Sequence, residues 1–211
     1  MIDKVYAELR RLRRFDYLAT AQILPSDGVY VVFEPAEVVV WRGMEICRVT
    51  RVGINRVDGR LAERIRKHYG NPDGLGGDRR QNVFRRHVGA ALLRMENPEH
   101  PQLGPWLGRH GQFPEHEAKL STWLREHTCC RCIRVQNRDE RHCLERGLIA
   151  LFAQCRLGEP SCEWLGHYAS DENVVRSGLW NSHHVDAQPL TEAEFDLLRH
   201  RIDETLGELG D

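Results

Sequence analysis

Two β-rich runs followed at once by a cationic helical segment most constrain how this chain can fold. Residues 28–34 read GVYVVFE and residues 45–55 read EICRVTRVGIN, and both are rich in β-branched side chains. Residues 59–70 read GRLAERIRKHYG, in which two arginines and a histidine recur at four-residue spacing. That spacing puts the three side chains on one face of a helix. The sequence therefore predicts a strand pair that presents a basic helix.

A third β-rich run lies between these two. Residues 37–41 read EVVVW, and Arg42 and Gly43 after them are typical of a turn. The runs together predict a three-stranded antiparallel meander, and the helical patterns that follow predict helices around it. We expect an α+β fold in which helices flank a small antiparallel sheet, three-stranded with room for an extra hairpin strand.

Length and composition fit a soluble globular protein. The chain has 211 residues, of which 41% are hydrophobic and 29% are charged, so it can bury a core without disulfides or metals. No apolar run approaches the roughly 20 residues that span a bilayer, and residues 1–14 lack the apolar segment of a secretory signal. We expect a cytoplasmic protein.

The net charge of −1 hides a strong asymmetry along the chain. Residues 51–90 carry 10 basic and 4 acidic side chains, whereas residues 91–211 carry 13 and 20. A local excess of positive charge is the pattern expected of a protein that binds a phosphate backbone. A solvated, charge-rich helix surface gives the same pattern.

The seven cysteines are an odd number, and Cys129, Cys130 and Cys132 crowd into one short segment. Reduced thiols suit this spacing better than a disulfide framework. The segment TCCRCIRV predicts a buried strand whose cysteines act as small apolar residues, and a zinc site is the alternative.

Helical patterns continue on both sides of this central region. Residues 3–14 predict an amphipathic helix whose terminal arginines suit the negative end of the helix dipole as well as they suit DNA. Residues 71–80, NPDGLGGDRR, predict a basic glycine loop that fits either a nucleic-acid backbone or an ordinary surface position. Thr191 and Glu194 form a capping box that predicts a final structural helix.

Glu145 is the most informative acidic residue. It lies at helical spacing from Leu148, Ile149 and Phe152, in a helix that a capping residue at Asn137 predicts. A carboxylate therefore occupies the end of an apolar stripe, and its burial is costly unless it is paired or binds a cation. The residues alone leave open both a salt bridge to an arginine and a metal ligand.

In the order and spacing of these segments, the chain resembles the GIY-YIG nuclease family. The first family signature falls on Gly28-Val29-Tyr30 and the second on Arg51-Val52-Gly53. The helix arginine of the family falls on Arg64. Residues 144–152, LERGLIALF, resemble the family's helix in which one glutamate holds the divalent metal, and Glu145 falls on that position.

The resemblance implies a GIY-YIG-like fold that hydrolyses DNA phosphodiester bonds with Mg²⁺ or Mn²⁺. Glu145 would hold the metal, Arg64 would bind the scissile phosphate, and Tyr30 with His68 would activate the nucleophile. DNA is the implied partner. The residues expected to bind it are Arg51, Arg79, Arg80 and Asn181.

One signature departs from the family pattern, because Arg51 stands where the family has a tyrosine. This favours, as an alternative, a catalytically degraded member of the fold that binds nucleic acid or protein. We expect residues 1–27 to form an N-terminal helix and lead-in, and residues 28–156 to form the nuclease core with a helical insertion. Residues 157–211 are expected to form an extension packed on that core.

Overall fold

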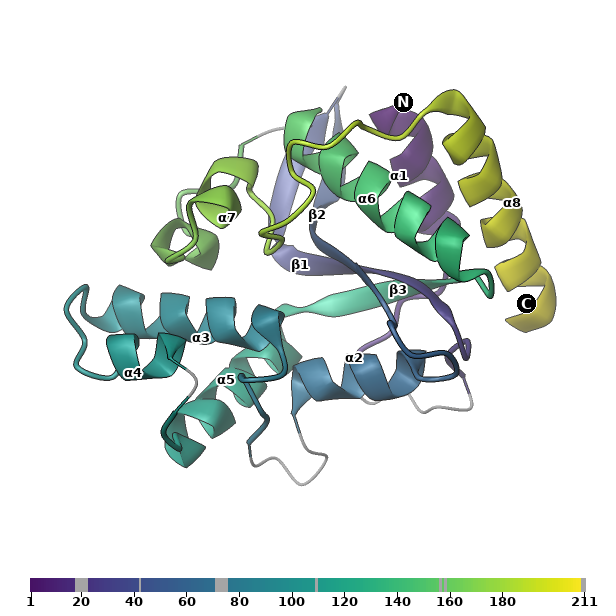
Figure 1. The fold of residues 1–211 in the computed structure, drawn as a ribbon. Helices are drawn as coiled ribbons and strands as arrows, with labels where there is room; N and C mark the ends of the chain where they lie inside the picture. The colour runs from purple at the N-terminus through teal and green to yellow at the C-terminus, as the bar shows by residue number, and fades with distance from the viewer. Residues whose placement is uncertain are drawn as a thin grey trace.

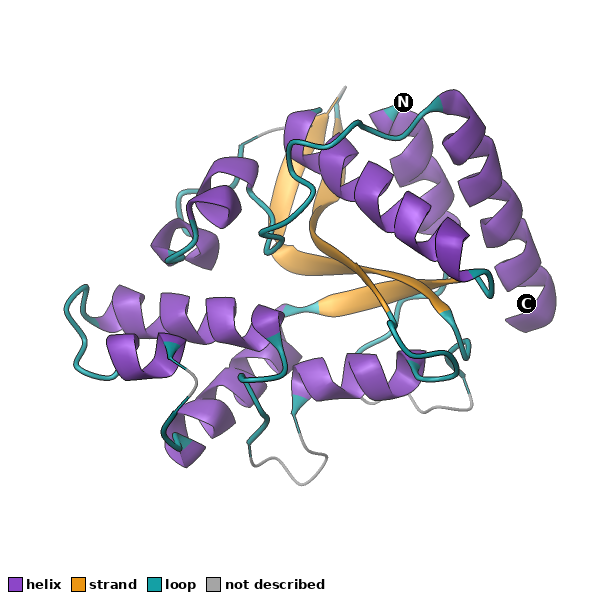
Figure 2. Ribbon diagram, viewed as in Figure 1, coloured by secondary structure: helices purple, strands orange, loops and turns teal. Residues whose placement is uncertain are grey.

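The computed structural model describes residues 1–17, 23–41, 43–70, 76–108, 110–155, 157 and 159–209. Within these residues, three strands form one antiparallel sheet in the order β2-β1-β3. The strands are β1 (Gly28–Trp41), β2 (Met44–Ile54) and β3 (Cys129–Arg134). The helices are α1 (Ile2–Arg11), α2 (Leu61–Tyr69), α3 (Val83–Glu96), α4 (Leu103–Leu107), α5 (Pro114–His127), α6 (Arg138–Gln154), the 3₁₀ turn η1 (Leu165–Tyr168), α7 (Glu172–Ser177) and α8 (Glu192–Leu209). Figures 1 and 2 show the sheet between two groups of helices.

The predicted α+β class with a three-stranded antiparallel sheet is confirmed, but the predicted meander is wrong. The runs GVYVVFE and EVVVW belong to one long strand, β1, which turns into β2 between Trp41 and Met44. The ladder shifts register between Val32 and Phe33 and again before Val38, so β1 passes Pro35 without a break. The third strand is the cysteine-rich segment, which pairs with the other edge of β1.

The cysteine segment is therefore a buried strand, as predicted. Cys129, Cys130 and Cys132 are each at most 3% exposed, and every cysteine of the chain is a free thiol. Close pairing with β3 also explains the glycine that opens β1. A Cβ at Gly28 would collide with the carbonyl oxygen of Ile133, so only glycine fits there.

The two faces of the sheet carry separate cores, because successive residues of a strand point to opposite faces. Val29, Val31 and Phe33 join a core built with α1, α6 and α8. Tyr30 and Val32 join a core built with α2, α3 and α5. Figure 1 shows α6 and α8 on one side of the sheet and α2, α3 and α5 on the other, so the fold has a helix–sheet–helix arrangement.

The segment after α7 covers the free edge of β2. The backbone N–H of Trp180 donates to the carbonyl of Thr50 at 2.7 Å. Asn181 accepts from the N–H of Val52 at 3.0 Å and donates to its carbonyl at 2.9 Å. These bonds satisfy backbone groups that an edge strand would otherwise expose. Part of the C-terminal region is thus hydrogen-bonded to the core, whereas the division of the chain at residues 27 and 156 stays a prediction.

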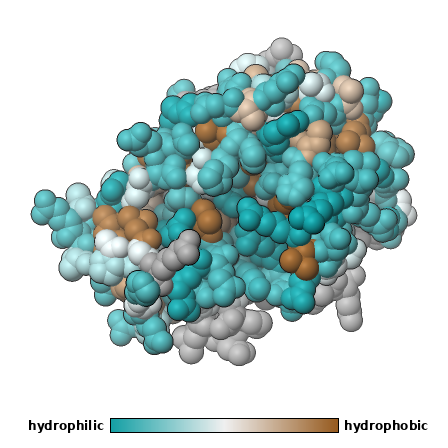
Figure 3. Space-filling model, viewed as in Figure 1, coloured by the Kyte–Doolittle hydropathy of each residue, from teal (hydrophilic) through white to brown (hydrophobic). Residues whose placement is uncertain are grey.

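The predicted helix signals are confirmed at two starts. Asn137 accepts hydrogen bonds from the N–H groups of Asp139 and Glu140 at the start of α6. Thr191 and Glu194 form the reciprocal bonds of a capping box before α8. None of the described helices is long and apolar enough to cross a membrane. Hydrophilic side chains dominate the face in Figure 3, and hydrophobic ones lie scattered among them.

Candidate active site

Tyr30 of β1 and His68 of α2 meet on the α2 face of the sheet. The Tyr30 hydroxyl lies 2.6 Å from Nε2 of His68, and the two residues are 1% and 3% exposed. Gly53 is opposite Tyr30 in β2, where a Cβ would collide with the Tyr30 hydroxyl. The glycine of the second signature therefore makes room for the tyrosine of the first.

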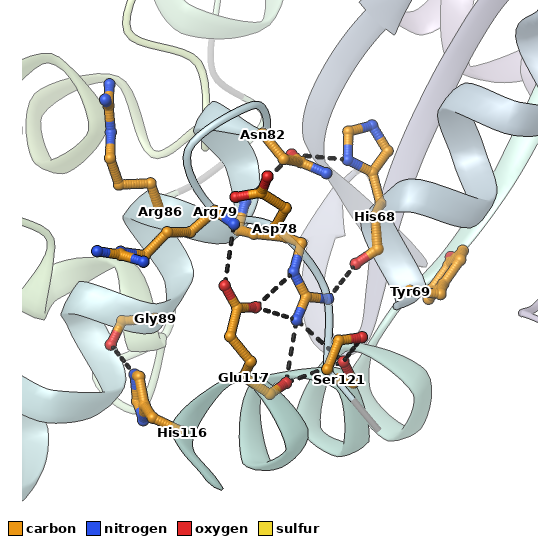
Figure 4. Close-up of polar contacts among 12 residues, drawn as sticks. His68, Tyr69, Asp78, Arg79, Asn82, Arg86, Gly89, His116, Glu117 and Ser121 are labelled. Carbon is orange, nitrogen blue, oxygen red and sulfur yellow. Dashed lines mark hydrogen bonds and ion pairs between the residues drawn. The ribbon is translucent and has the colours of Figure 1, made fainter. Parts of the chain in front are cut away.

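Asn82, which precedes α3, fixes the tautomer of His68. Its amide nitrogen donates to the carbonyl of Lys67 at 2.8 Å, which leaves Oδ1 to accept from Nδ1–H of His68 at 3.1 Å (Figure 4). Nε2 then accepts the Tyr30 O–H. Burial, followed by the charges of Arg64 and Arg51, lowers the pKa of His68 well below its usual value. The imidazole is therefore neutral near pH 7.

Glu145 of α6 is half-buried and has no partner at contact distance. Among the described residues its carboxylate forms no hydrogen bond and no ion pair. Burial raises the pKa of Glu145, while the charges of Arg51, Arg56 and Arg64 act in the opposite direction. The arginines are close enough to attract the carboxylate without neutralising it by contact. Its oxygens are available to a cation.

Arg51 and Arg64 join Glu145 to the Tyr30–His68 pair. Both arginines act on the pKa of His68 and on that of Glu145, and such influence falls with distance. The guanidinium of Arg64 has no hydrogen-bond or ion-pair partner in the described part of the chain, and its Nε is buried. Four elements, β1, β2, α2 and α6, thus contribute residues to one candidate site.

Arg51 is buried inside this site. It is 7% exposed, and its guanidinium donates to the carbonyl of Trp180 at 2.5 Å and lies 4.9 Å from the ring centre of Phe84. Its Nε is buried with no partner among the described residues. The register shift at Val32 falls beside it, and such irregularities redirect side chains.

A cationic cavity of about 300 Å³ adjoins Arg64 on the outer side of α2. Arg56, Arg60 and Lys67 also line it, together with one acidic residue, Glu63. Arg60 and Lys67 are held by Glu63 at 2.8 and 2.7 Å. Arg56 and Arg64 form no ion pair with Glu63 or with another described residue, so their charge is available to bind a phosphate group.

The donor set of this site suits a metal that is shared with a substrate. In the described part of the chain, no group of three or more His, Cys, Asp or Glu side chains could hold an ion. Mg²⁺, however, keeps several waters and binds one or two carboxylates together with substrate phosphates. Glu145 fits that mode, because its carboxylate is unpaired and partly desolvated.

Three of the four residues that the sequence assigned to nucleic-acid binding are engaged inside the protein: Arg51, as described above, Arg79 and Asn181. Arg79 is 3% exposed, and its guanidinium donates to main-chain carbonyls, with the shortest bonds of 2.7 Å to Trp106 and 2.8 Å to His110. Asn181 is 6% exposed, and its amide is fully used by Val52. The side chains of Arg79 and Asn181 hold backbone in place through these bonds, and their assignment to DNA binding stays a prediction. The sequence could not distinguish a side chain that binds DNA phosphates from one that binds the protein's own backbone carbonyls, because both roles need hydrogen-bond donors.

Arg80 remains exposed beside this region and forms an ion pair with Asp78 at 2.9 Å. The first half of the predicted glycine loop, residues 71–75, lies outside the described residues. Arg60, at the start of α2, is exposed. The predicted one-face stripe on α2 therefore runs from an exposed arginine through half-buried Arg64 to buried His68.

A buried ionic network between α3 and α5 holds the end of α2 that contributes His68 to the site. Glu117 of α5 accepts from the Arg85 guanidinium at 2.6 and 3.0 Å and from the backbone N–H of Arg79 at 2.9 Å. Arg85 also donates to the carbonyl of His68 at 2.9 Å and to Ser121 at 2.9 Å. Figure 4 shows Glu117 and Ser121 converging on this network from α5. The network fixes the end of α2 that carries His68.

Three residues near the site were not predicted as site residues. Asn82 has only the ordinary signal of a helix cap. Arg56 lies in a loop and has no periodic signal. His87 of α3 is 6% exposed, and both of its ring nitrogens lack hydrogen-bond partners among the described residues. Burial lowers the pKa of His87 to about 4, and the nearby Arg51 acts in the same direction.

Comparison with known proteins gives one match. A family model described as GIY-YIG domain matches residues 1–207 of the chain. No curated protein matches it, and no solved structure does.

Proposed function

The chain belongs to the GIY-YIG family, and we propose that it is a divalent-metal-dependent endonuclease that hydrolyses phosphodiester bonds in DNA. The family suggests nuclease-type chemistry. The finer assignment depends on the arrangement of side chains around Glu145.

One observation carries the proposal: a half-buried carboxylate with no partner among the described residues shares its neighbouring arginines with a neutral histidine that is hydrogen-bonded to Tyr30. Buried charges in proteins are normally paired, so an unpaired one is a candidate for function. Hydrolysis of a phosphodiester needs groups that neutralise the phosphate and a group that takes a proton from water. Arg64 with Arg56, and Tyr30 with His68, supply these groups.

Arg64 binds the scissile phosphate and stabilises the charge that develops on it. Its planar N–H donors match the geometry of phosphate oxygens, and the guanidinium stays positively charged without taking up a proton during the reaction. Arg56 binds a neighbouring phosphate in the cationic cavity. Glu145 would hold a divalent metal, which would supply stabilisation of negative charge at the leaving oxygen.

Tyr30 and His68 take up the proton that the attacking water loses. As Tyr30 accepts it, the Tyr30 proton passes to Nε2 of His68 across 2.6 Å. In the free protein the positive charges of Arg64 and Arg51 oppose protonation of His68. A bound phosphate offsets those charges and makes His68 a better base. Because both rings are buried, the proton is not shared with bulk water.

The test is cleavage of supercoiled plasmid and branched DNA by the purified protein with Mg²⁺, Mn²⁺ or EDTA. We expect nicking or cutting with either metal and none with EDTA. Binding without cleavage under every metal condition would overturn the proposal.

That outcome would favour a catalytically degraded member that binds nucleic acid. The observation in its favour is Arg51, which replaces the family tyrosine and donates to the Trp180 carbonyl inside the site. Retention on DNA that weakens as salt rises, unchanged by Glu145→Ala, is the expected behaviour of such a module.

A further inference from the structure

A second cavity, of about 520 Å³, lies under α1 and away from the candidate active site. Its lining comes from α1 and the segment after it, from Phe33 in the middle of β1, and from the beginnings of β2 and β3. Tyr6, Leu9 and Phe33 form its apolar wall, and they belong to the core on the α1 face of the sheet. None of Tyr30, Arg64, His68 and Glu145 lines it.

Three arginines line this cavity: Arg10, Arg14 and Arg131. Arg14 is exposed and forms no hydrogen bond or ion pair among the described residues. Arg131 uses one guanidinium nitrogen to cap the carbonyls at the end of α1, with bonds of 2.9 Å to Leu9 and 2.8 Å to Arg10. Among the described residues its other guanidinium nitrogens have no hydrogen-bond acceptor, and none of them is buried without a partner. They are open to an incoming acceptor.

Little negative charge balances these arginines. Glu45 is the acidic residue in the lining. Two thiols and one phenol also line the cavity, and they are neutral near pH 7. Burial raises the pKa of Cys129 to about 11 and that of Tyr6 to about 12, and it raises the pKa of Cys47. Three positive groups and one negative group leave an excess that matches a doubly charged anion.

The cavity also has an apolar side. The Arg131 guanidinium lies 5.6 Å from the ring centre of Phe33 and so covers the aromatic wall from one side. Guanidinium groups and aromatic rings stack on planar bases without regard to sequence. The volume lies within the range of roughly 300–1,000 Å³ that is usual for small-ligand sites.

We propose that this cavity binds an organic phosphate monoester with a planar apolar body, of the size of a mononucleotide. The phosphate lies on Arg14 and Arg131 at the mouth, and the base lies against Phe33 and Leu9. The same chemistry is offered by a free mononucleotide and by the 5′-phosphate at the end of a DNA strand. The site does not depend on the proposed nuclease activity, because it shares no residue with that site.

The experiment is isothermal titration of the full chain in EDTA at low salt. The probes are 2′-deoxyadenosine 5′-monophosphate, deoxyadenosine, inorganic phosphate, and a short single-stranded oligonucleotide with and without a 5′-phosphate. The variants are Arg14→Ala for this cavity and Arg64→Ala for the active site. Circular dichroism checks that both variants keep the fold.

We expect the nucleotide or the phosphorylated oligonucleotide to bind with 1:1 stoichiometry. Affinity should be at least 10-fold above that of the probe lacking the phosphate and that of inorganic phosphate. Arg14→Ala should weaken binding of 2′-deoxyadenosine 5′-monophosphate about 10-fold, and Arg64→Ala should leave the binding of this nucleotide unchanged. Tighter binding of the nucleotide assigns the cavity to a free metabolite, and tighter binding of the oligonucleotide assigns it to a strand end. Binding lost in Arg64→Ala but kept in Arg14→Ala overturns the proposal, as does equal binding with and without the phosphate.

Discussion

Glu117 and Glu145 both lie on helices that pack against the sheet, yet their surroundings are opposite. Glu117 is 5% exposed and receives two hydrogen bonds from Arg85 and one from the backbone. Glu145 has arginines in its surroundings but no partner in contact among the described residues. A paired buried carboxylate stabilises a particular packing, whereas an unpaired one costs stability and needs another explanation.

The same contrast separates the arginines. The guanidinium of Arg79 donates hydrogen bonds to backbone carbonyls, and that of Arg85 donates to Glu117. Arg56 and Arg64 have no such acceptors among the described residues, and both line the cationic cavity beside α2. In this comparison the satisfied charges of Arg79 and Arg85 belong to the scaffold, and the unsatisfied charges of Arg56 and Arg64 adjoin the candidate active site.

The largest effect on stability is expected from Glu117→Ala. It leaves the Arg85 guanidinium buried without its carboxylate, and breaking such a pair costs about 3–5 kcal/mol. Urea unfolding followed by circular dichroism measures the loss. A double variant, Arg85→Met with Glu117→Leu, should recover most of it. A single variant as stable as the wild type would show that the network is not structural.

Glu145→Ala should have the opposite profile. We expect DNA cleavage to fall by about 10³-fold, which corresponds to about 4 kcal/mol of barrier. The free energy of unfolding should stay the same or increase, because an unpaired, partly buried carboxylate is removed. Plasmid nicking and urea unfolding are measured on one preparation. Wild-type cleavage in this variant would contradict the assignment of Glu145.

His87 is buried and stays neutral near pH 7, so its protonation should lower the stability of the folded protein in acid. Its pKa in the folded protein is about 4, below the ordinary value of 6.5. The unfolded chain therefore binds the proton first as the pH falls. The stability that depends on neutral His87 is complete above pH 6.5 and is lost towards pH 4, by about 3 kcal/mol for this shift.

The measurement is urea unfolding between pH 7 and pH 4.5 for the wild type and His87→Leu. The variant should lose less stability over this range than the wild type. His68 contributes in the same direction in both proteins, since its pKa is also lowered. Parallel curves would mean that His87 is not titrating as a buried neutral group.

Tyr30→Phe should lower cleavage by about 10²-fold, within the range for loss of a proton-transfer group. The affinity for DNA should not change, because in the proposed mechanism the hydroxyl exchanges a proton with the attacking water and with His68 and does not bind the phosphate. His68→Asn should have a similar effect. If the two residues act as one relay, the double variant should be no slower than either single one. Additive losses would separate their roles.

The smallest effect is expected for Arg56→Ala. Arg56 is exposed and would contact one phosphate, so affinity for DNA should fall a few-fold and the slope of log K against log salt should decrease by about 0.9. Arg199→Ala is the matched control, because Arg199 is exposed on α8 and pairs with Asp196 at 3.2 Å. Equal losses in both variants would indicate a general charge effect instead of a defined contact.

Much of the secondary structure could be predicted because its signals are local. The capping residues Asn137 and Thr191 and the β-branched run of β1 are recognisable from neighbours in the chain. The spacing of Arg64 and His68 likewise predicted that both lie on α2. The pairing of β1 with the distant cysteine strand was not predictable in this way, because strand pairing depends on contacts between segments far apart in sequence.

The sequence by itself determined the residue types of the candidate site: a tyrosine in a strand, an arginine and a histidine one turn apart, and a glutamate above an apolar stripe. Only the tertiary structure decided which of the charged side chains are already satisfied. In the sequence, Arg79 and Asn181 are as plausible as Arg64 for binding a phosphate. In the structure, their N–H groups donate hydrogen bonds to backbone carbonyls. The physical reason is that a polar group's role depends on the partners it meets when water is excluded, and those partners come from other parts of the chain.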